Sequence, residues 1–565
     1  MISPSQVIAA EWLLVLIALA LSFLLGRSKL RWLHRAEAAF ARFAARRKLA
    51  ILTVGLLPVV LRLALLPLMP PPTVQVEEEA SYLLQADTFL HGRLSNPPLP
   101  FSRYFDTPQV LQQPRYASTR PPGEGAFLAL GQFLFASPWA GVILIVSLMC
   151  MSGCWMVHGW FAPKWALLAG LLLALRIGVF TFWMNSYWGG ALAATGGFLV
   201  LGAYPRLLRT YSFRYIFIMW LGIVALATTR TYEGSLLLLP VAVALALHVF
   251  GPEHRTNRKQ LIQKLVIPAA ALLTLFLAWS CYYNFRVTGS PLLPPYTLGR
   301  MTQNIAPPFI FGHPRPMHAY TNRQMVQRFA GWEMILFMRS QNFPGWKQGT
   351  SQKISEFWSF YIRPLFTIPL LLLPLAVRSR KLRLFVAIAL TGLAGALLEV
   401  WGPSYYFAPF TPVVIIFALW GLRYLRSLRL WHSRPGYLFV TLVPLIAILV
   451  FTGLIFLQLK SLHVDEGVLQ WASYENRMPQ RAIVEQELQQ IPGKHLVFVR
   501  YTREHDFLCE WVFNQADLQT AKIIWAREYD AHSNQQLAFY FADRHAWLVQ
   551  ADKPALPLRP YSPQD

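Results

Sequence analysis

Charged residues are scarce in this 565-residue chain, where Asp, Glu, Lys and Arg make up only 14%. Cysteine is rarer still, with four residues: Cys150, Cys154, Cys281 and Cys509. None of them forms a CxxC pair or a His/Cys cluster with metal-ligand spacing, so a structural zinc site is not expected. The sequence therefore identifies no metal ligand and no cofactor. A divalent metal is compatible with it but not implied.

Apolar residues take the place of the missing charges, at 55% of the chain, and they recur in long runs. A bilayer core about 30 Å thick needs about 20 apolar residues per helix, and a helix satisfies its own backbone groups there. These runs predict an all-α polytopic membrane protein with about twelve transmembrane helices. The predicted spans are 8–26, 50–69, 138–158, 164–180, 190–204, 213–228, 235–250, 265–283, 361–377, 384–400, 407–422 and 437–458.

The net charge of +24 follows the predicted topology. Six connections between alternate spans hold 24 of the 51 basic residues and only two acidic residues, Glu37 and Glu253. With twelve spans these connections all fall on one side, as the positive-inside rule requires. The charge therefore indicates a lipid bilayer and no nucleic acid as partner. It predicts a multi-pass protein of the plasma (inner) membrane with both termini on the extracytoplasmic side.

Three regions follow from this topology. Residues 1–49 are expected to form an extra N-terminal transmembrane helix and a basic interfacial helix, and residues 50–459 the transmembrane domain with outer loops 70–137 and 284–360. Residues 460–565 predict a small soluble extracytoplasmic α/β domain, with apolar strands at 496–499, 523–526 and 546–549. Strands that alternate with helices favour a mostly parallel sheet.

Three consecutive carboxylates, Glu77, Glu78 and Glu79, follow the second span and a proline run. This position at the mouth of a membrane helix suits a catalytic base, although acids also favour the start of any helix. Arg120 precedes Pro121-Pro122 later in the same loop. A guanidinium on a rigid turn suits bidentate phosphate binding. The alternative is a surface ion pair between Arg120 and Glu124 four residues on.

These residues resemble the GT-C glycosyltransferases, most of all the protein mannosyltransferase and aminoarabinose transferase group, over roughly residues 50–425. The resemblance implies a polyprenyl-phosphate sugar donor at the outer face. It also implies that Glu78 is the catalytic base, that Glu79 takes the second acidic position, and that Arg120 and the nearby Tyr116 bind the donor phosphate. Glu78 stands where the family has Asp, which leaves Glu77 or Glu79 as alternative bases.

Further polar and aromatic residues lie at the outer ends of predicted spans or in the outer loop. As candidates for a substrate cavity we take Tyr82, Tyr187, Trp188, Arg230, Glu233, Tyr405 and Tyr406. Aromatic residues at this depth also form the interfacial belt of membrane proteins. Both interpretations stay open at this point.

The sequence thus predicts a membrane glycosyltransferase that moves a hexosyl or pentosyl group from a polyprenyl-phosphate donor to an acceptor hydroxyl, with inversion implied by the resemblance. The acceptor is an unidentified glycan, lipid or protein. The alternatives are a lipid-linked glycan flippase or transporter and an O-antigen-ligase-like enzyme. A transporter usually shows internal repeats and helices interrupted at mid-membrane. The polar residues here gather instead at one face.

Overall fold

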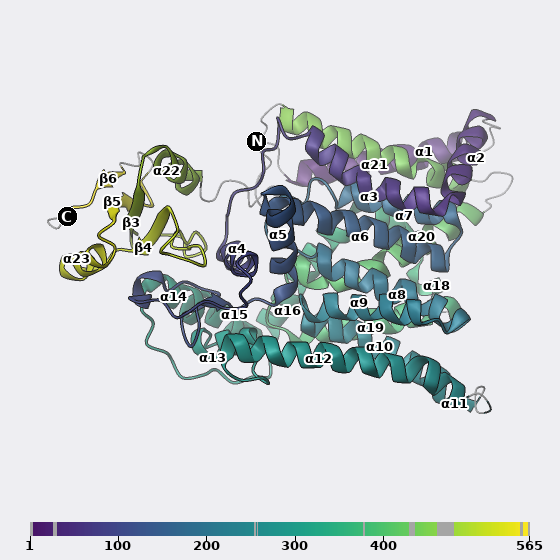
Figure 1. Ribbon diagram of the computed structural model, residues 1–565. Coiled ribbons are helices and arrows are strands. Elements are labelled where there is room, and N and C mark those ends of the chain that lie inside the picture. The colour runs from purple at the N-terminus through teal and green to yellow at the C-terminus, as the bar shows by residue number, and fades with distance from the viewer. Residues whose placement is uncertain are drawn as a thin grey trace.

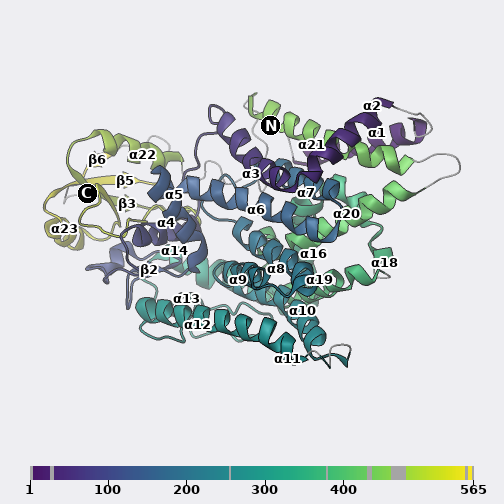
Figure 2. The same cartoon turned by 45° about the vertical axis from the view of Figure 1, so that its right-hand side comes forward.

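The computed structural model describes residues 4–25, 31–252, 256, 258–376, 379–428, 435–459, 479–553 and 558–562. Long helices run roughly side by side in one bundle, and a small sheet domain lies beyond one end (Figure 1). Shorter helices, among them α4 (Glu77–Leu90) and α13 (Pro295–Gln303), lie between the two. The same order is visible after a 45° turn (Figure 2).

Eight helices in the described ranges are long and apolar enough to cross a membrane. They are formed by α1 (Pro4–Leu25), α6 (Pro138–Trp160), α8 (Ala191–Thr210), α10 (Thr231–Phe250), α11 (Arg258–Leu261) with α12 (Ile267–Thr288), α19 (Arg383–Leu398), η7 (Ser404–Phe410) with α20 (Thr411–Ser427), and α21 (Pro435–Leu459). The all-α polytopic fold is therefore confirmed.

The count of twelve is not confirmed. The other four predicted spans form shorter or more charged helices: α3 (Arg47–Ala64), α7 (Pro163–Arg176), α9 (Phe213–Ala227), and the pair α17 (Arg363–Leu370) and α18 (Leu373–Ala376). Three basic residues lie within α3, and prolines at the start and near the end of α17 interrupt the last segment. Apolar composition alone did not reveal these breaks, because a proline counts little in a hydropathy average but removes a helix hydrogen bond.

The first helix is an integral part of the bundle. α1 packs against α21 and α17, and its Glu11 lies 2.7 Å from the guanidinium of Arg363. Both side chains are buried. The basic segment predicted to be interfacial forms α2 (Arg31–Ala45), whose Glu37 binds Lys164 and Arg426. α2, α11 and α18 lie at the end of the bundle away from the sheet domain (Figure 1).

The segment after α3 folds back over the other end of the bundle. α4 is followed by the short antiparallel pair β1 (Val110–Leu111) and β2 (Ala117–Ser118), and then by α5 (Pro122–Phe135). The Ser81 hydroxyl on α4 hydrogen-bonds the Ser118 hydroxyl at 2.7 Å and donates to the Gln109 carbonyl, also at 2.7 Å. This fixes α4 against β2, two residues before Arg120.

The C-terminal region contains a four-stranded sheet in the order β4-β3-β5-β6. Its strands are β3 (Lys494–Arg500), β4 (Ile523–Arg527), β5 (Arg544–Gln550) and β6 (Arg559–Pro560), flanked by helices α22 (Pro479–Gln490) and α23 (Ala531–Tyr540). β3 pairs in parallel with β4 and β5, and only β6 is antiparallel. The predicted mostly parallel sheet is confirmed. Part of the predicted domain, residues 460–478, 554–557 and 563–565, lies outside the described residues.

This sheet domain docks directly onto the loops around α4. Tyr104 and Phe105 of the first outer loop pack into its apolar core. The Ala516 amide donates to Asp87 at the far end of α4 at 2.6 Å, and Arg527 donates to Gln324 at 2.7 Å. The helix that begins with the three glutamates is thus held from both sides.

Candidate active site

The three glutamates at the start of α4 diverge to three different partners. Successive residues on a helix point about 100° apart, so adjacent acids need not share one environment. Glu77 pairs with Arg328, Glu78 pairs with Arg120, and Glu79 accepts backbone hydrogen bonds. The mutual repulsion of the acids is relieved because each has its own donors.

Glu78 and Arg120 form a close ion pair. The Arg120 side chain is 7% exposed and the Glu78 side chain 13%, so water reaches the carboxylate but screens the pair little. The backbone of Arg120 is held by its own amide, which donates to the Ser118 hydroxyl at 3.0 Å, and by Gln85, which donates to its carbonyl at 2.9 Å. The guanidinium therefore projects from a fixed turn.

Glu77 is paired with an arginine that the sequence analysis did not select. Arg328, in η4 (Val326–Trp332), lies 3.1 Å from the Glu77 carboxylate and 3.8 Å from that of Glu333. Its guanidinium carbon also lies 4.6 Å from the ring centre of Trp332. Burial raises the pKa of Glu77, against the pull of Arg328.

The Glu79 carboxylate is hydrogen-bonded to backbone amides, and Glu79 lines none of the cavities described below. Its carboxylate accepts hydrogen bonds from the amides of Gln75 (2.6 Å), Val76 (3.2 Å) and Tyr187 (2.9 Å). It thus caps α4 and ties it to the loop before α8. The side chain is fully buried, and that burial raises its pKa to about 7 in spite of the three donors. This geometry favours a scaffolding role for Glu79, not the catalytic role that the sequence analysis expected.

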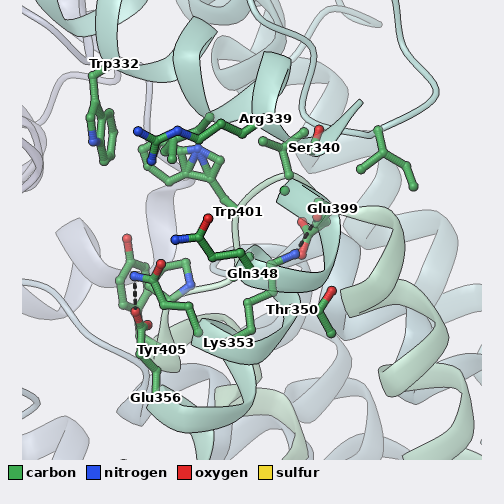
Figure 3. Close-up of a pocket in the computed structure, with 18 of the residues that line it drawn as sticks. Trp332, Arg339, Ser340, Gln348, Thr350, Lys353, Glu356, Glu399, Trp401 and Tyr405 are labelled. Atoms are coloured by element: carbon green, nitrogen blue, oxygen red, sulfur yellow. Dashed lines mark hydrogen bonds between the residues drawn. The ribbon is translucent and has the colours of Figure 1, made fainter. Parts of the chain in front are cut away.

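Four cavities that share wall residues lie at and next to the Glu78–Arg120 pair. The first, here called the tryptophan cavity, has a volume of about 480 Å³ and is lined by Trp188, Trp332, Trp346 and Trp401 together with Glu78. Figure 3 shows Trp332, Arg339 and Trp401 grouped on one side of it, with Lys353 and Glu356 of α16 (Phe343–Phe357) on another. Lys353 donates to the carbonyls of Ala396 and Glu399.

The second cavity is a narrow junction of about 70 Å³, lined by Glu78, Arg120 and Arg328. The third, the arginine cavity, measures about 360 Å³ and is lined by Arg120 and Arg230. The fourth, the apolar groove, measures about 960 Å³ and runs between α3, α5, α6, α8, α9 and α12. Each shares wall residues with the next: Glu78 joins the first two cavities, Arg120 the next two, and Pro122 and Trp279 the last two.

Arg230 holds its place by ring contacts. It directly precedes α10, and its guanidinium carbon lies 4.4 Å from the ring centre of Tyr405 and 4.5 Å from that of Tyr406. Within the described residues its guanidinium has no hydrogen-bond or ion-pair partner, although Glu233 lies three residues on. Stacking on two aromatic faces fixes a guanidinium while its N–H groups stay available to a ligand.

The other expected cavity residues divide into two groups. Tyr82 and Glu233 line the arginine cavity, Trp188 and Tyr405 line the tryptophan cavity, and Tyr406 lines both the junction and the arginine cavity. Tyr187 lies behind the site, where its hydroxyl donates to the Pro72 carbonyl at 2.9 Å. For all of these residues except Tyr187, the positions favour a place in the cavity wall over a place in the interfacial aromatic belt.

The structure differs from two other expectations, which concern Tyr116 and the Arg120–Glu124 pair. The structure does not bring Tyr116 to the cavities: it is buried against Leu84 and Ala516, and its hydroxyl points to the Asn514 carbonyl at 3.4 Å. The alternative Arg120–Glu124 surface pair is also not formed, because Arg120 turns to Glu78. Glu124 is buried, and this burial raises its pKa to about 8.

Arg328, Trp332, Arg339 and Lys353 were all missed by sequence reasoning. They lie in the outer segment 284–360, which has no apolar periodicity to orient its side chains. The available signal was the run of basic and aromatic residues between Arg323 and Trp346 in a chain otherwise poor in charge. Within the described ranges, no group of three or more His, Cys, Asp or Glu side chains could hold a metal ion.

No protein-family model matches this sequence, and no curated protein matches it. Among solved structures, the chain is similar to ArnT from Cupriavidus metallidurans bound to undecaprenyl phosphate, with 14% identity, 88% of this chain and 92% of that chain covered, and a TM-score of 0.45. It is also similar to the archaeal oligosaccharyltransferase AglB from Archaeoglobus fulgidus in complex with an inhibitory peptide and a dolichol-phosphate. That match has 12% identity, covers 89% of this chain and 69% of that chain, and has a TM-score of 0.44.

Both matches cover most of this chain. With TM-scores below 0.5 they concern the general course of the chain, and they assign it no substrate and no residue role.

Proposed function

We propose that this chain is a membrane glycosyltransferase that takes a sugar from a polyprenyl-phosphate donor and transfers it to an acceptor hydroxyl at the extracytoplasmic face. One observation carries the proposal: the Glu78–Arg120 ion pair lines the junction, which shares Glu78 with the tryptophan cavity and Arg120 with the arginine cavity. A carboxylate that can act as a base and a guanidinium that can bind an anion thus lie together, between the cavities that lead towards the apolar groove and the tryptophan cavity.

The order of the cavities assigns a part of the donor to each. The apolar groove suits the polyprenyl chain because its walls are almost wholly apolar and border the membrane helices. The arginine cavity suits the phosphate, which Arg120 and Arg230 would bind from two sides. The bond between phosphate and sugar then lies beside Glu78.

The tryptophan cavity lies on the other side of Glu78 and suits the acceptor. Indole faces pack against sugar rings and other amphipathic groups, and the polar side chains of α16 offer hydrogen bonds. Glu78 lines this cavity and Arg120 does not, so an acceptor hydroxyl held there would meet Glu78 first. Attack on the anomeric carbon from the side opposite the leaving phosphate would invert its configuration.

The ion pair also orders the steps. Before the donor binds, Arg120 is paired with the Glu78 carboxylate. A donor phosphate competes for the guanidinium and releases Glu78 to accept the proton of the acceptor hydroxyl. Arg120 then stabilises the negative charge on the leaving polyprenyl phosphate, as an oxyanion-hole donor does.

The test is a binding and turnover measurement on the full chain in lipid nanodiscs. Undecaprenyl phosphate should bind, and undecaprenol, which has the same tail without the phosphate, should bind far more weakly. Polyprenyl-phosphate sugars should release polyprenyl phosphate when the chain is supplied with a mixture of envelope acceptors. Equal binding of the two lipids would contradict the phosphate site, and transport of the intact donor without cleavage would favour a flippase.

A further inference from the structure

A fifth pocket lies at the end of the bundle opposite the site described above. It measures about 720 Å³ and opens between the end of α6, the start of α7 and the end of α20. Both α7 and α20 reach the end of the bundle away from the sheet domain (Figure 1). This is the end where the basic connections lie.

The rim of this pocket is cationic. Lys164, Arg423 and Arg426 line it, and its lining contains no Asp or Glu. Lys164 (3.0 Å) and Arg426 (2.6 Å) share a single carboxylate oxygen of Glu37, which lies outside the lining. Arg423 has an exposed side chain and, within the described residues, no carboxylate partner. The pocket thus has three cations, of which two share the Glu37 carboxylate, and the charge of Arg423 is open to a ligand.

The walls of the same pocket are aromatic. Trp160, Trp165, Trp420 and Tyr424 line it, and Trp420 stacks on Tyr424 with ring centres 5.6 Å apart. Trp and Tyr favour the depth at which lipid headgroups meet acyl chains, because one side of each ring system is apolar and the other polar. Cationic and aromatic side chains in one lining match the charged headgroup and the adjoining apolar part of a phospholipid.

We propose that this pocket binds the headgroup of an anionic phospholipid from the leaflet on the basic side of the membrane, with its phosphate at Arg423. Charge complementarity and the position between the ends of membrane helices argue for a lipid, since basic pockets between helices on this side recognise anionic headgroups. Glu37 ties the rim to α2, so a bound lipid would link α2, α7 and α20 at one point. The site is independent of the glycosyl-transfer chemistry.

The experiment measures lipid retention by the purified full chain with native mass spectrometry. Phosphatidylglycerol and phosphatidylcholine with identical acyl chains are compared, because the first has a net anionic headgroup and the second a zwitterionic one. The wild-type chain should retain phosphatidylglycerol and not phosphatidylcholine. Arg423→Gln should lower the affinity for phosphatidylglycerol about fivefold, which corresponds to about 1 kcal/mol. Arg423→Lys should keep most of the wild-type affinity for phosphatidylglycerol, because the charge is retained.

The matched control is Arg214→Gln. Arg214 is another exposed arginine, in the first turn of α9 and outside the pocket, so this change removes the same charge from the protein. The affinity of the Arg214→Gln variant for phosphatidylglycerol should differ less than twofold from that of the wild type. Equal losses in the two variants would overturn the site in favour of a diffuse charge effect, and equal retention of both lipids would overturn it too. Displacement of the lipid by millimolar inorganic phosphate would show a free-anion site instead.

Discussion

The Arg120 guanidinium lies directly against the Glu78 carboxylate, although 41 residues separate them along the chain. Glu78 lies in the first turn of α4 and Arg120 shortly before α5, and the Ser81–Ser118 hydrogen bond holds the two segments together. In the proposed function, this ion pair links donor binding to catalysis. The first two predictions follow from this pair.

Replacing Glu78 with Gln keeps the size of the side chain and removes the base. Turnover should fall by about 10²–10⁴-fold, the usual contribution of general-base catalysis. Affinity for undecaprenyl phosphate should persist or increase, because Arg120 is no longer held by a carboxylate. The check is a transfer assay beside lipid binding. If Glu78→Gln transferred sugar at the wild-type rate while Glu79→Gln was inactive but stable, the roles of the two residues would be exchanged.

Replacing Arg120 with Ala should weaken undecaprenyl-phosphate binding at least about tenfold, or about 1.4 kcal/mol, because a buried charge partner is removed. Arg120→Lys should recover part of the loss, since the charge survives although the bidentate geometry does not. Glu124→Gln is the control, because it alters a nearby buried carboxyl that does not pair with Arg120. Equal, small effects of Arg120→Ala and Glu124→Gln on lipid affinity would remove Arg120 from the donor site.

Glu79 should make the stability of the fold depend on pH. Its pKa is about 7 in the folded chain, above the ordinary value of 4.5, so the folded state binds this proton more tightly than the unfolded state. Its contribution to the free energy of unfolding is therefore largest below about pH 4.5, declines as the pH rises towards 7, and is constant above that. The difference in Tm between the wild type and Glu79→Gln, measured from pH 4.5 to 8, isolates this group. The Tm of the wild type minus the Tm of Glu79→Gln should fall as the pH rises over this range. A rise in this quantity would contradict the assignment.

Glu11→Gln should destabilise the bundle, since it leaves Arg363 without its buried carboxylate partner. Breaking such a pair by removing one member costs about 3–5 kcal/mol. The loss should appear as a lower Tm of the purified protein. The double variant Glu11→Gln with Arg363→Met should regain part of it, because the second change removes the buried charge. A double variant as unstable as the sum of its single changes would show that the two residues do not act as a pair.

The orientation of the chain predicts that the sheet domain is extracytoplasmic. A reporter that is active only outside the cytoplasm, fused after residue 460, should be active. The same reporter fused within the connection between α8 and α9 should be silent, since that connection is one of the six basic ones. The reverse pattern would place the candidate site on the cytoplasmic side.

The membrane class and most of the helices were predictable from the sequence because apolar run length is a local property. The eight long helices and the parallel strands β3, β4 and β5 arise from patterns within short windows. The broken pair α17 and α18 was not predicted, since prolines interrupt a run that is apolar throughout. The sequence also placed Glu78 and Arg120 on one loop with the residue types that the proposed chemistry needs.

Only the tertiary structure distinguished the three glutamates from one another. Glu79 meets the Tyr187 amide across 108 positions, and Glu77 meets an arginine in the segment 284–360. The stacking of Arg230 on Tyr405 and Tyr406 likewise joins the ends of two distant helices. Local spacing determines which residues share an element and a face. The partner of a buried charge depends instead on how elements hundreds of residues apart pack together, because a charge removed from water is stabilised by whichever donor or counter-charge the folded chain brings within hydrogen-bonding distance.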